Sequence, residues 1–468
     1  MDNVRHIHMI AVCGMGMGAF AGLLRDAGYR VTGSDQNVYP PMSDQLREAG
    51  IRVMSPYSAD NLNERPDLVI VGNAVKRVNP EAVALLERGI PYMSFPEALN
   101  RFFLSGRKSL VVAGTHGKTT TASMVAWILE KCGRDPGFLI GGVLNNFGRT
   151  CKAGKGEHFV VEGDEYDTAF FDKGPKFMHY SPSSAIITSV EFDHGDIYRD
   201  IDHVKSAFAK FIRLIPDDGE LVICGDFPHA VSLIPEASCG VETYGLSDDC
   251  DWRPVDVALG ERSSYAVSFR GERLASVELS VPGLHNVVNS LGAIALLSHQ
   301  GLSVKEAAAA LASFEGVKRR QEIRGVVNGV TVIDDFAHHP TKVRATVDAI
   351  KARYGDRRVW AVFEPRTNSS RRSFFQKDYA GSFDSADRIV IADVFNKEQI
   401  SCGERFSSER LVEDLRAKGL NADFVPTSEE IVKFVASGAN PGDVVLIMSN
   451  GGFDNVHARL LEALAARA

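Results

Sequence analysis

The chain has 468 residues, of which 24% are charged, and a formal net charge of -8 at pH 7. A chain of this length is too long for one hydrophobic core, so we expect about three domains. The acidic balance argues against a nucleic-acid-binding protein, because such proteins usually carry a basic face. Every apolar run is shorter than the ~18 residues of a membrane span, so we expect no membrane partner.

The seven cysteines are scattered along the chain without the paired spacing of a metal site. We interpret them as free thiols in a reducing compartment. The first apolar run leads directly into glycines and lacks a secretory pattern. These features predict a cytoplasmic protein, and they leave its oligomeric state open.

The first stretch, residues 1–107, alternates expected strands and helices. We expect a strand at 7–13, a helix at 20–27, a second strand at 29–32, and a later strand and helix at 68–75 and 81–88. This alternation predicts a parallel α/β domain.

A glycine-rich turn follows the first expected strand. It contains Gly14, Gly16 and Gly18, and Asp35 follows the next expected strand. The pattern resembles a dinucleotide-binding turn, which holds a diphosphate whether it belongs to NAD or to UDP. A tight turn with a purely structural role is the alternative.

The second stretch, residues 108–316, begins with an apolar strand, a short polar loop and an amphipathic helix. Such a loop presents backbone N–H groups and a helix N-terminus to phosphate. Lys118 would reach the β- and γ-phosphates, and the Thr119 hydroxyl would coordinate Mg²⁺. The alternative is a helix-starting turn with a solvated lysine, since the loop is shorter than the usual pattern. The loop consists of Gly114, Thr115, His116, Gly117, Lys118, Thr119 and Thr120.

Acidic residues end two further apolar runs of this stretch. Glu162, Asp164, Glu165 and Asp167 follow one run, and the segment 191–194 follows the next. Carboxylates at strand ends near a phosphate loop suit Mg²⁺, which prefers oxygen ligands. Their alternative role is to cap the following helices.

After a hydrophilic region at 247–272, which we expect to be an irregular β insertion, the segment 282–301 predicts a helix. Asn286 and Asn289 lie on one face of it. Their amides could pair with adenine or cap the helix, and the sequence does not choose between these roles.

The third stretch, residues 317–468, again alternates apolar runs with expected helices. The run Lys318-Arg319-Arg320 could clamp phosphate or could be a solvated charge run. Two acids and two histidines, in the segment 334–339, follow an apolar strand directly. Ligands collect at the carboxyl ends of strands in open parallel sheets, so we expect a binding site there.

Taken together and in this order, the motifs resemble those of the Mur ligases over essentially the whole chain. The shared patterns are GTHGKTTT, E-x-D-E, D-H, H-N-x-x-N, G-x-x-R-R and D-D-[YF]-x-H-H-P. The resemblance implies an α/β protein of three domains: a Rossmann-like UDP-binding domain, a central P-loop ATPase domain and a Rossmann-like C-terminal domain that binds the amine substrate. It implies an ATP-dependent ligase that uses Mg²⁺ and forms an amide bond through an acyl phosphate.

Within the family, the chain is similar to ligases that act on UDP-N-acetylmuramate. One branch adds L-alanine, and another attaches the recycled murein tripeptide L-alanyl-γ-D-glutamyl-meso-diaminopimelate. The segments FDKGPKF at 171–177, EPRTN at 364–368 and MSNGGF at 448–453 resemble the tripeptide branch. Some members hold a second metal with a carbamylated lysine, but neither Lys205 nor Lys210 fits its spacing, so we assign none.

The resemblance also implies roles for individual residues. The catalytic residues would be Lys118, Glu162 and His194, and the metal ligands Thr119, Glu162 and His194. In addition to the loop 114–120, ATP would meet His285, Asn286, Asn289, Arg320 and Asp334. The UDP-sugar would meet Gly14, Gly16, Gly18, Asp35, Asn73, His116 and Glu165. The peptide would meet Arg366, Thr367, Asn368 and Asn450.

Three other readings of the sequence stay open. An L-alanine ligase would share the chemistry but would not need a cationic receptor such as Arg366. An NAD-dependent dehydrogenase would explain the first glycine turn, but not the phosphate loop or the segment 334–340. A nucleotide-binding switch without catalytic activity is the third.

Overall fold

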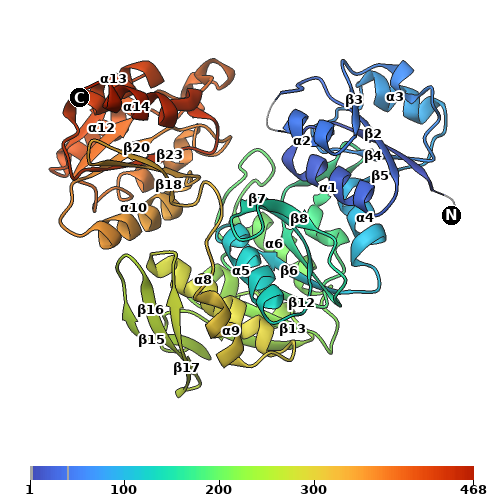
Figure 1. Ribbon diagram of the computed structural model, residues 1–468, viewed down its shortest axis with the longest axis horizontal. Coiled ribbons are helices and arrows are strands. Elements are labelled where there is room, and N and C mark those ends of the chain that lie inside the picture. The colour runs from blue at the N-terminus through green and yellow to red at the C-terminus, as the bar shows by residue number, and fades with distance from the viewer. Residues whose placement is uncertain (1–3, 40–41, 468) are drawn as a thin grey trace.

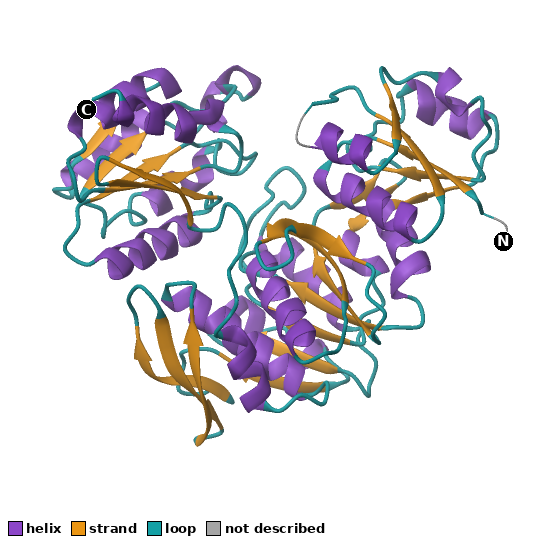
Figure 2. Cartoon of the chain, viewed as in Figure 1, coloured by secondary structure: helices purple, strands orange, loops and turns teal. Residues whose placement is uncertain are grey.

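The computed structural model describes residues 4–39 and 42–467. Figure 1 shows three α/β units: the N-terminal unit in blue, the central unit from cyan to yellow, and the C-terminal unit in orange and red. Helices cover both faces of the sheets in Figure 2. The expected three-domain α/β fold is confirmed.

The N-terminal sheet is parallel, with strand order β3-β2-β1-β4-β5 in the described residues. All five residues of β1 are buried, as expected for a central strand between layers of helices. The strands are β1 (His6–Ile10), β2 (Arg30–Ser34), β3 (Arg52–Met54), β4 (Leu68–Val71) and β5 (Tyr92–Ser94). The helices are α1 (Met15–Asp26), α2 (Met42–Glu48), η1 (Ala59–Leu62), α3 (Pro80–Glu87), α4 (Phe95–Leu99) and η2 (Asn100–Leu104).

Helix α1 begins earlier than the sequence pattern predicted. We expected a glycine turn up to residue 19, but Gly16 and Gly18 lie in the first turn of the helix. A Cβ at Gly18 would collide with the side chain of Met42 on α2. The glycines therefore allow close helix packing, while the turn itself is made by residues 11–14.

The central sheet has the order β17-β16-β15-β14-β13-β12-β6-β9-β7-β8 in the described residues. The strands are β6 (Lys108–Ala113), β7 (Gly137–Leu144), β8 (Arg149–Lys152), β9 (His158–Gly163), β12 (Ser184–Ile187), β13 (Glu220–Cys224), β14 (Gly240–Tyr244), β15 (Trp252–Ala258), β16 (Ser263–Phe269) and β17 (Glu272–Leu279), and the hairpin strands are β10 (Asp167–Ala169) and β11 (Asp172–Pro175). The helices are α5 (Lys118–Lys131), η3 (Lys176–His179), α6 (Ile201–Ile212), α7 (Pro228–Val231), η4 (Ile234–Glu236), α8 (Leu284–Ser298) and α9 (Val304–Leu311).

The region 247–272, expected to be an irregular β insertion, contains strands β15 and β16, and β17 begins at its end. The three strands pair antiparallel, with a register shift in each pairing, and extend the central sheet. Trp252, Tyr265 and Val277 pack into the core, and along β17 the buried Val277 and Leu279 alternate with the exposed Ser276 and Glu278. An antiparallel sheet covered on one face needs only such half-apolar strands, which look hydrophilic in the sequence.

The C-terminal sheet has the order β18-β19-β23-β20-β21-β22 in the described residues, with β18 antiparallel to β19. Alternate residues of β20 pack into two different clusters, Ala361 and Phe363 into one and Trp360 and Val362 into the other. The strands are β18 (Glu322–Val327), β19 (Val330–Asp335), β20 (Val359–Phe363), β21 (Arg388–Ile391), β22 (Ala422–Phe424) and β23 (Val444–Met448). The helices are α10 (Pro340–Tyr354), η5 (Ser373–Phe375), α11 (Gln376–Tyr379), η6 (Lys397–Gln399), η7 (Cys402–Glu404), α12 (Ser408–Ala417), α13 (Ser428–Gly438), η8 (Phe453–Asn455) and α14 (Val456–Ala465).

Within residues 4–39 and 42–467, none of the helices combines the length and apolar character that a bilayer crossing requires. All seven cysteines are free thiols, as the sequence predicted.

Candidate active site

The loop between β6 and α5 turns sharply at two glycines. Gly114 has φ 132° and Gly117 has φ 81°, a backbone region that residues with a Cβ rarely adopt. A Cβ at Gly114 would also collide with Thr188 and Ser189, which follow β12. Gly117 is the N-cap of α5 and has no side chain to cap the amide groups of the first turn. The loop therefore presents a helix N-terminus to an anion.

Lys118, the first residue of α5, is one of three charged side chains that contact one another in a row. Its Nζ donates to the Gly114 carbonyl at 2.6 Å and to Glu165 Oε2 at 2.7 Å, and Glu165 Oε1 lies 3.5 Å from His194 Nε2. Burial opposes ionisation of Glu165, but Lys118 and His194 lower its pKa to about 2. Burial also opposes the charge on His194, yet Glu165 and Asp193 raise its pKa to about 9. Both cations are therefore held by one carboxylate at neutral pH.

A second carboxylate, that of Glu162, ends β9 beside the first turn of α5. Thr119 Oγ1 donates to Glu162 Oε2 at 3.0 Å, and the Gly141 amide donates to Oε1 at 2.6 Å. Burial and repulsion from Asp164 raise the pKa of Glu162. A Mg²⁺ ion would relieve both effects, because it supplies positive charge and prefers oxygen ligands. The residues present therefore fit Mg²⁺.

His194, the third predicted metal ligand, lies beside Glu165. Its Nε2 is the atom that faces the carboxylate, and the ring is protonated at neutral pH. A metal ion binds neutral imidazole, so ligation by this atom requires that its proton leaves first.

A cavity of about 960 Å³ lies beside the phosphate loop, between the central and C-terminal domains. Its lining includes the first turns of three helices, α5, α8 and α10. Each helix N-terminus carries partial positive charge, so the cavity favours an anionic ligand. The volume is within the range of about 300–1,000 Å³ typical of small-molecule sites. The predicted ATP residues that line it are His116, Gly117, Thr119, Thr120, His285, Asn286, Asn289 and Arg320.

The two asparagines of α8 have defined partners. Asn286 Nδ2 donates to the Pro282 carbonyl at 2.8 Å, and Asn289 Nδ2 lies 3.3 Å from Asn286 Oδ1. Asn289 also packs against the phosphate loop, where a Cβ at Gly117 would lie 2.8 Å from its Oδ1. The amide groups of the first turn are not their targets, so these contacts do not support the helix-capping alternative.

The two linker arginines both lie over the ring of Phe336 but otherwise have different surroundings. Arg319 pairs with Asp334 at 3.2 Å and donates to the carbonyls of Ser449 and Gly451 at 2.8 and 2.7 Å. The guanidinium carbon of Arg320 lies 4.7 Å from the ring centroid of Phe336, and its side chain lines the cavity.

The neighbouring acids Asp334 and Asp335 also have different surroundings. Asp334 lies with Arg319 and is 3.3 Å from His457 Nε2. Among the described residues, the cavity lining includes Asp335 and leaves out Asp334. The structure thus places Asp335, the neighbour of the predicted Asp334, at the cavity.

Polar contacts join the central and C-terminal domains next to the phosphate loop. Glu191 accepts from Thr341 Oγ1 at 3.1 Å and pairs with His116 Nε2 at 2.9 Å. The rings of His116 and His339 lie 4.3 Å apart. The His194 amide donates to Ser369 Oγ at 3.1 Å. The segment 191–194 therefore contacts two parts of the C-terminal domain, the first turn of α10 and the segment after β20.

The segment after β20 carries most of the predicted peptide residues. Arg366 NH1 donates to Glu364 at 3.2 Å, and its guanidinium carbon lies 3.7 Å from the ring centroid of Phe395. Thr367 bonds with Ser370, and Asn368 Nδ2 donates to Asp196 of the central domain at 3.0 Å.

Asn450, the remaining predicted peptide residue, follows β23. Within the described residues, its Oδ1 is buried without a hydrogen-bond partner. A buried acceptor without a donor is unfavourable, which favours a ligand donor at this position.

The predicted UDP-sugar residues fall into two groups. Asp35 accepts from the amides of Cys13 and Asn37 at 2.9 and 3.0 Å and so braces the turn before α1. Asn73 is exposed after β4. The other group, Glu165 and His116, lies with the phosphate loop, while the loop residues Gly14, Gly16 and Gly18 lie at the N-terminus of α1.

From the sequence we gave no individual role to Glu191, Asp335 or Ser369, although Glu191 and Asp335 belong to segments that we selected. Glu191 and Ser369 follow strands, and Asp335 ends one. Other residues at the same strand ends were predicted as site residues. Their position at the carboxyl ends of strands was the available signal, and it does not separate a residue from its neighbours.

A phosphate loop, an acid cluster that fits Mg²⁺ and an interdomain cavity define a multidomain nucleotide-dependent enzyme. Three family models cover almost the whole chain: "Mur ligase family, catalytic domain" at 6–107, "Mur ligase middle domain" at 112–297 and "Mur ligase, glutamate ligase domain" at 319–451. The chain belongs to the Mur ligase family of ATP-dependent, amide-bond-forming enzymes. Membership excludes the dehydrogenase and the inactive switch as readings of the sequence.

Full-length relatives show which members of the family the chain resembles. UDP-N-acetylmuramate–L-alanyl-γ-D-glutamyl-meso-2,6-diaminoheptandioate ligase of Escherichia coli (strain K12) is 42% identical and covers 99% of both chains. The crystal structure of a murein peptide ligase from Psychrobacter arcticus 273-4 has a TM-score of 0.73 and 37% identity, covering 98% of this chain and 99% of that one. A UDP-N-acetylmuramate–alanine ligase from Thermotoga maritima has a TM-score of 0.81 at 27% identity, covering 100% of both.

Proposed function

We propose that the protein joins UDP-N-acetylmuramate to the tripeptide L-alanyl-γ-D-glutamyl-meso-diaminopimelate, with hydrolysis of ATP to ADP and phosphate. The proposal rests first on the full-length likeness to a ligase with this printed activity, at 42% identity. It rests also on the cationic loop at the end of β20, because the tripeptide carries several carboxylates and L-alanine only one.

This cationic loop contains Arg366, Arg371 and Arg372. Arg371 NH2 donates to Asn368 Oδ1 at 2.8 Å, and burial together with repulsion from Arg372 and Arg366 lowers the pKa of Arg371. The surroundings of Arg371 therefore disfavour its positive charge in the free protein. A ligand with several carboxylates relieves that repulsion, and the planar arginine fork binds carboxylates through two parallel hydrogen bonds.

The reaction has two steps. A carboxylate oxygen of the sugar acid attacks the γ-phosphorus of ATP, the bond to the ADP oxygen breaks, and an acyl phosphate forms. The peptide amine then attacks the acyl carbon, the bond to phosphate breaks, and the amine proton leaves with a base. Phosphorylation makes the second step possible because phosphate is a far better leaving group than oxide.

The residues of the phosphate loop stabilise the charge that moves in the first step. We assign Lys118 to the β- and γ-phosphates, and Thr119, Glu162 and His194 to Mg²⁺. When bound, Mg²⁺ neutralises phosphate charge and orients the transferred group. Arg320 and Asp335 would approach the nucleotide from the linker and the C-terminal domain, because both line the cavity.

We assign the diphosphate of the UDP-sugar to the first turn of α1. Gly14 and Gly16 leave the backbone accessible there, Gly18 lets α2 pack against the helix, and Asp35 fixes the turn. In this reading Asn73 contacts the sugar nucleotide from the end of β4. Glu165 and His116 contact the sugar acid near the phosphate loop, where the carboxylate must meet ATP.

The substrates suggest a wider role. ATP and UDP-sugars are cytoplasmic metabolites, and attaching a free murein tripeptide returns it to a cell-wall precursor. We therefore assign the protein to peptidoglycan recycling in the cytoplasm, with domains at 1–107, 108–316 and 317–468. The family models begin and end close to these boundaries.

The alternative substrate is L-alanine, and the TM-score of 0.81 against an alanine ligase is the observation that favours it. The deciding experiment measures ADP release with UDP-N-acetylmuramate and MgATP, comparing tripeptide with L-alanine over a range of concentrations. The proposal requires a kcat/KM for tripeptide at least about a hundredfold above that for L-alanine, since one receptor carboxylate contact alone gives about tenfold or more. Equal values, or a preference for L-alanine, would contradict it.

A further inference from the structure

Lys342 is a basic residue of the cavity that has no assigned role. It lies in the first turn of α10 and lines the same cavity as Gly117 and Thr119 of the phosphate loop. Among residues 4–39 and 42–467, its ammonium group has no hydrogen-bond or ion-pair partner. This distinguishes it from Lys118, whose charge is balanced by Glu165 at 2.7 Å.

The groups around Lys342 do not favour its charge in the free protein. Burial, followed by the nearby cations Arg320 and Lys118, lowers the pKa of Lys342 to about 7, against the opposing attraction of Asp335 and Asp193. The N-terminus of α10 adds further positive charge. A lysine held among cations, with its own ammonium unpaired, indicates an anion that binds between them.

We propose that Lys342 binds a phosphate oxygen of the nucleotide, from the part of the cavity that the C-terminal domain lines. This inference rests on the proposed function, because it takes ATP as the ligand of the cavity. Phosphate supplies the missing partner for Lys342 and Arg320 and lies at the N-termini of α5 and α10 together. Since Lys342 belongs to the C-terminal domain, the phosphate chain then links that domain to the central one.

The test measures binding to the full-length protein by calorimetry, with MgATP and with adenosine as separate ligands. Lys342→Gln should raise the Kd for MgATP about tenfold or more, because a charged hydrogen bond is lost. The Kd for adenosine should not change, because adenosine has no phosphate. Lys342→Arg keeps the charge and should stay within about threefold of the parent protein. Lys377→Gln is the matched control, an exposed lysine of the same domain that lies away from the cavity lining.

The outcomes separate the role of Lys342 from the function itself. Unchanged MgATP binding by Lys342→Gln would overturn the inference and leave the proposed function standing. Equal weakening of adenosine and MgATP would also overturn it, because that result indicates a general loss of cavity structure. A parent protein that does not bind MgATP would overturn the proposed function together with the role of Lys342.

Discussion

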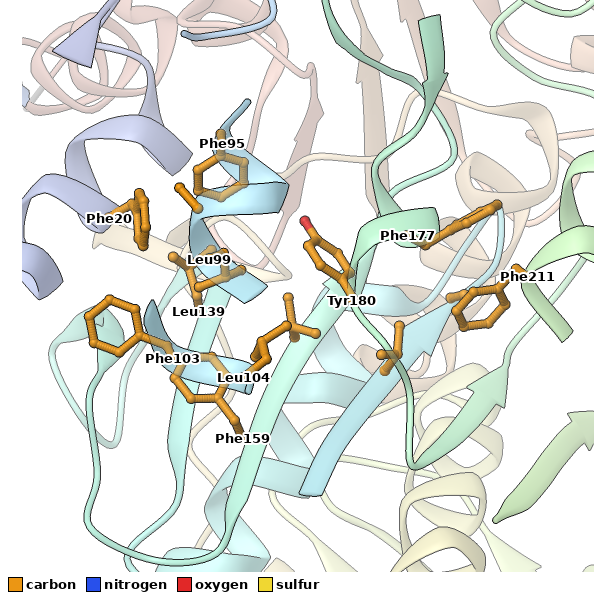
Figure 3. Packing of buried hydrophobic residues seen from close by; sticks show 14 of the residues in the cluster. Phe20, Phe95, Leu99, Phe103, Leu104, Leu139, Phe159, Phe177, Tyr180 and Phe211 are labelled. Atoms are coloured by element: carbon orange, nitrogen blue, oxygen red, sulfur yellow. The ribbon is translucent and has the colours of Figure 1, made fainter. Parts of the chain in front are cut away.

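The central domain meets its two neighbours in physically different ways. Toward the N-terminal domain, it shares one continuous hydrophobic cluster, in which Phe103 of the first domain packs against Phe20 of the same domain and Phe159 of the second (Figure 3). Toward the C-terminal domain, separate polar contacts such as Thr341 to Glu191 surround a large cavity. A shared apolar core joins the first pair of domains, whereas the second pair is joined by polar contacts and by the half-buried Phe192 against Phe374 and Phe375.

This difference between the two interfaces predicts which domain can move relative to the central one. A shared apolar core opens only if its surface is exposed to water, at about 25 cal/mol for each Å². Hydrogen bonds exchange readily with water, so an interface built from them separates at small net cost. The cavity that we assign to the nucleotide lies at the second interface, where closing and opening would admit ATP and exclude water during the reaction. The N-terminal domain instead should stay fixed to the phosphate-loop domain.

The largest expected effect tests the apolar interface. Phe103 is 7% exposed and touches both Phe20 and Phe159, so Phe103→Ala removes an aromatic ring from the shared core. We expect a loss of about 3–5 kcal/mol in the free energy of unfolding. Urea unfolding followed by circular dichroism measures it.

The matched control lies at the other interface. Phe374 is 40% exposed and its ring centroid lies 5.4 Å from that of Phe192. Much of this ring is already in contact with water. Phe374→Ala should therefore lower the free energy of unfolding by less than about half of the loss expected for Phe103→Ala. Equal losses in the two variants would mean that the interfaces do not differ as described.

The next effect concerns the chemistry at the polar interface. Lys118→Ala should lower kcat for ligation by about 10²–10³, the usual result of losing one preorganised charge at a reacting phosphate. Binding of UDP-N-acetylmuramate should change little, because we assign its diphosphate to glycines of the N-terminal domain. Stopped ADP-release assays and UDP-sugar titrations measure the two effects. Ligation within a few-fold of the parent enzyme would show that this loop does not bind the transferred phosphate.

Much of the fold was predictable because its patterns are local. The apolar run of β6, the polar loop and the helix α5 follow one another within about two dozen residues, so periodicity and glycine placement identify them. Strand β7, Gly137–Leu144, was not predicted, because paired glycines in its middle are typical of loops. Only its neighbours β8 and β9 make it a strand.

The site shows a similar limit at the level of single residues. Sequence reasoning led to Asp334, while Asp335 lines the cavity. Adjacent residues of a strand point to opposite faces, and β19 is buried on both, so its composition does not reveal which acid faces the ligand. Contacts such as that between Thr341 and Glu191 join residues 150 positions apart, which no local pattern encodes.

A third prediction tests substrate recognition by the C-terminal domain. Arg366→Lys keeps the positive charge but loses the planar fork and its packing on Phe395. The KM for tripeptide should rise by an amount equivalent to about 1.5–3 kcal/mol, as for a hydrogen bond to a charged group. The KM values for ATP and UDP-N-acetylmuramate should change far less. Steady-state kinetics with each substrate varied in turn would detect the opposite result, an unchanged KM for tripeptide.

The smallest expected effect tests whether polar contacts hold the C-terminal domain in place. Asn368 Nδ2 donates to Asp196 Oδ2 at 3.0 Å across the interface. Asn368→Asp replaces this hydrogen bond with two facing carboxylates at an exposed position. We expect kcat/KM for MgATP to fall about two- to fivefold at low salt and to recover partly at high salt, where surface charges are screened. Asp196→Asn introduced into the same chain restores a hydrogen bond and should restore the rate. If Asn368 acts only by binding peptide, that second substitution will not help, because Asp196 would have no part in the defect. Recovery in the double variant therefore identifies a contact between domains, and its absence identifies a contact with substrate.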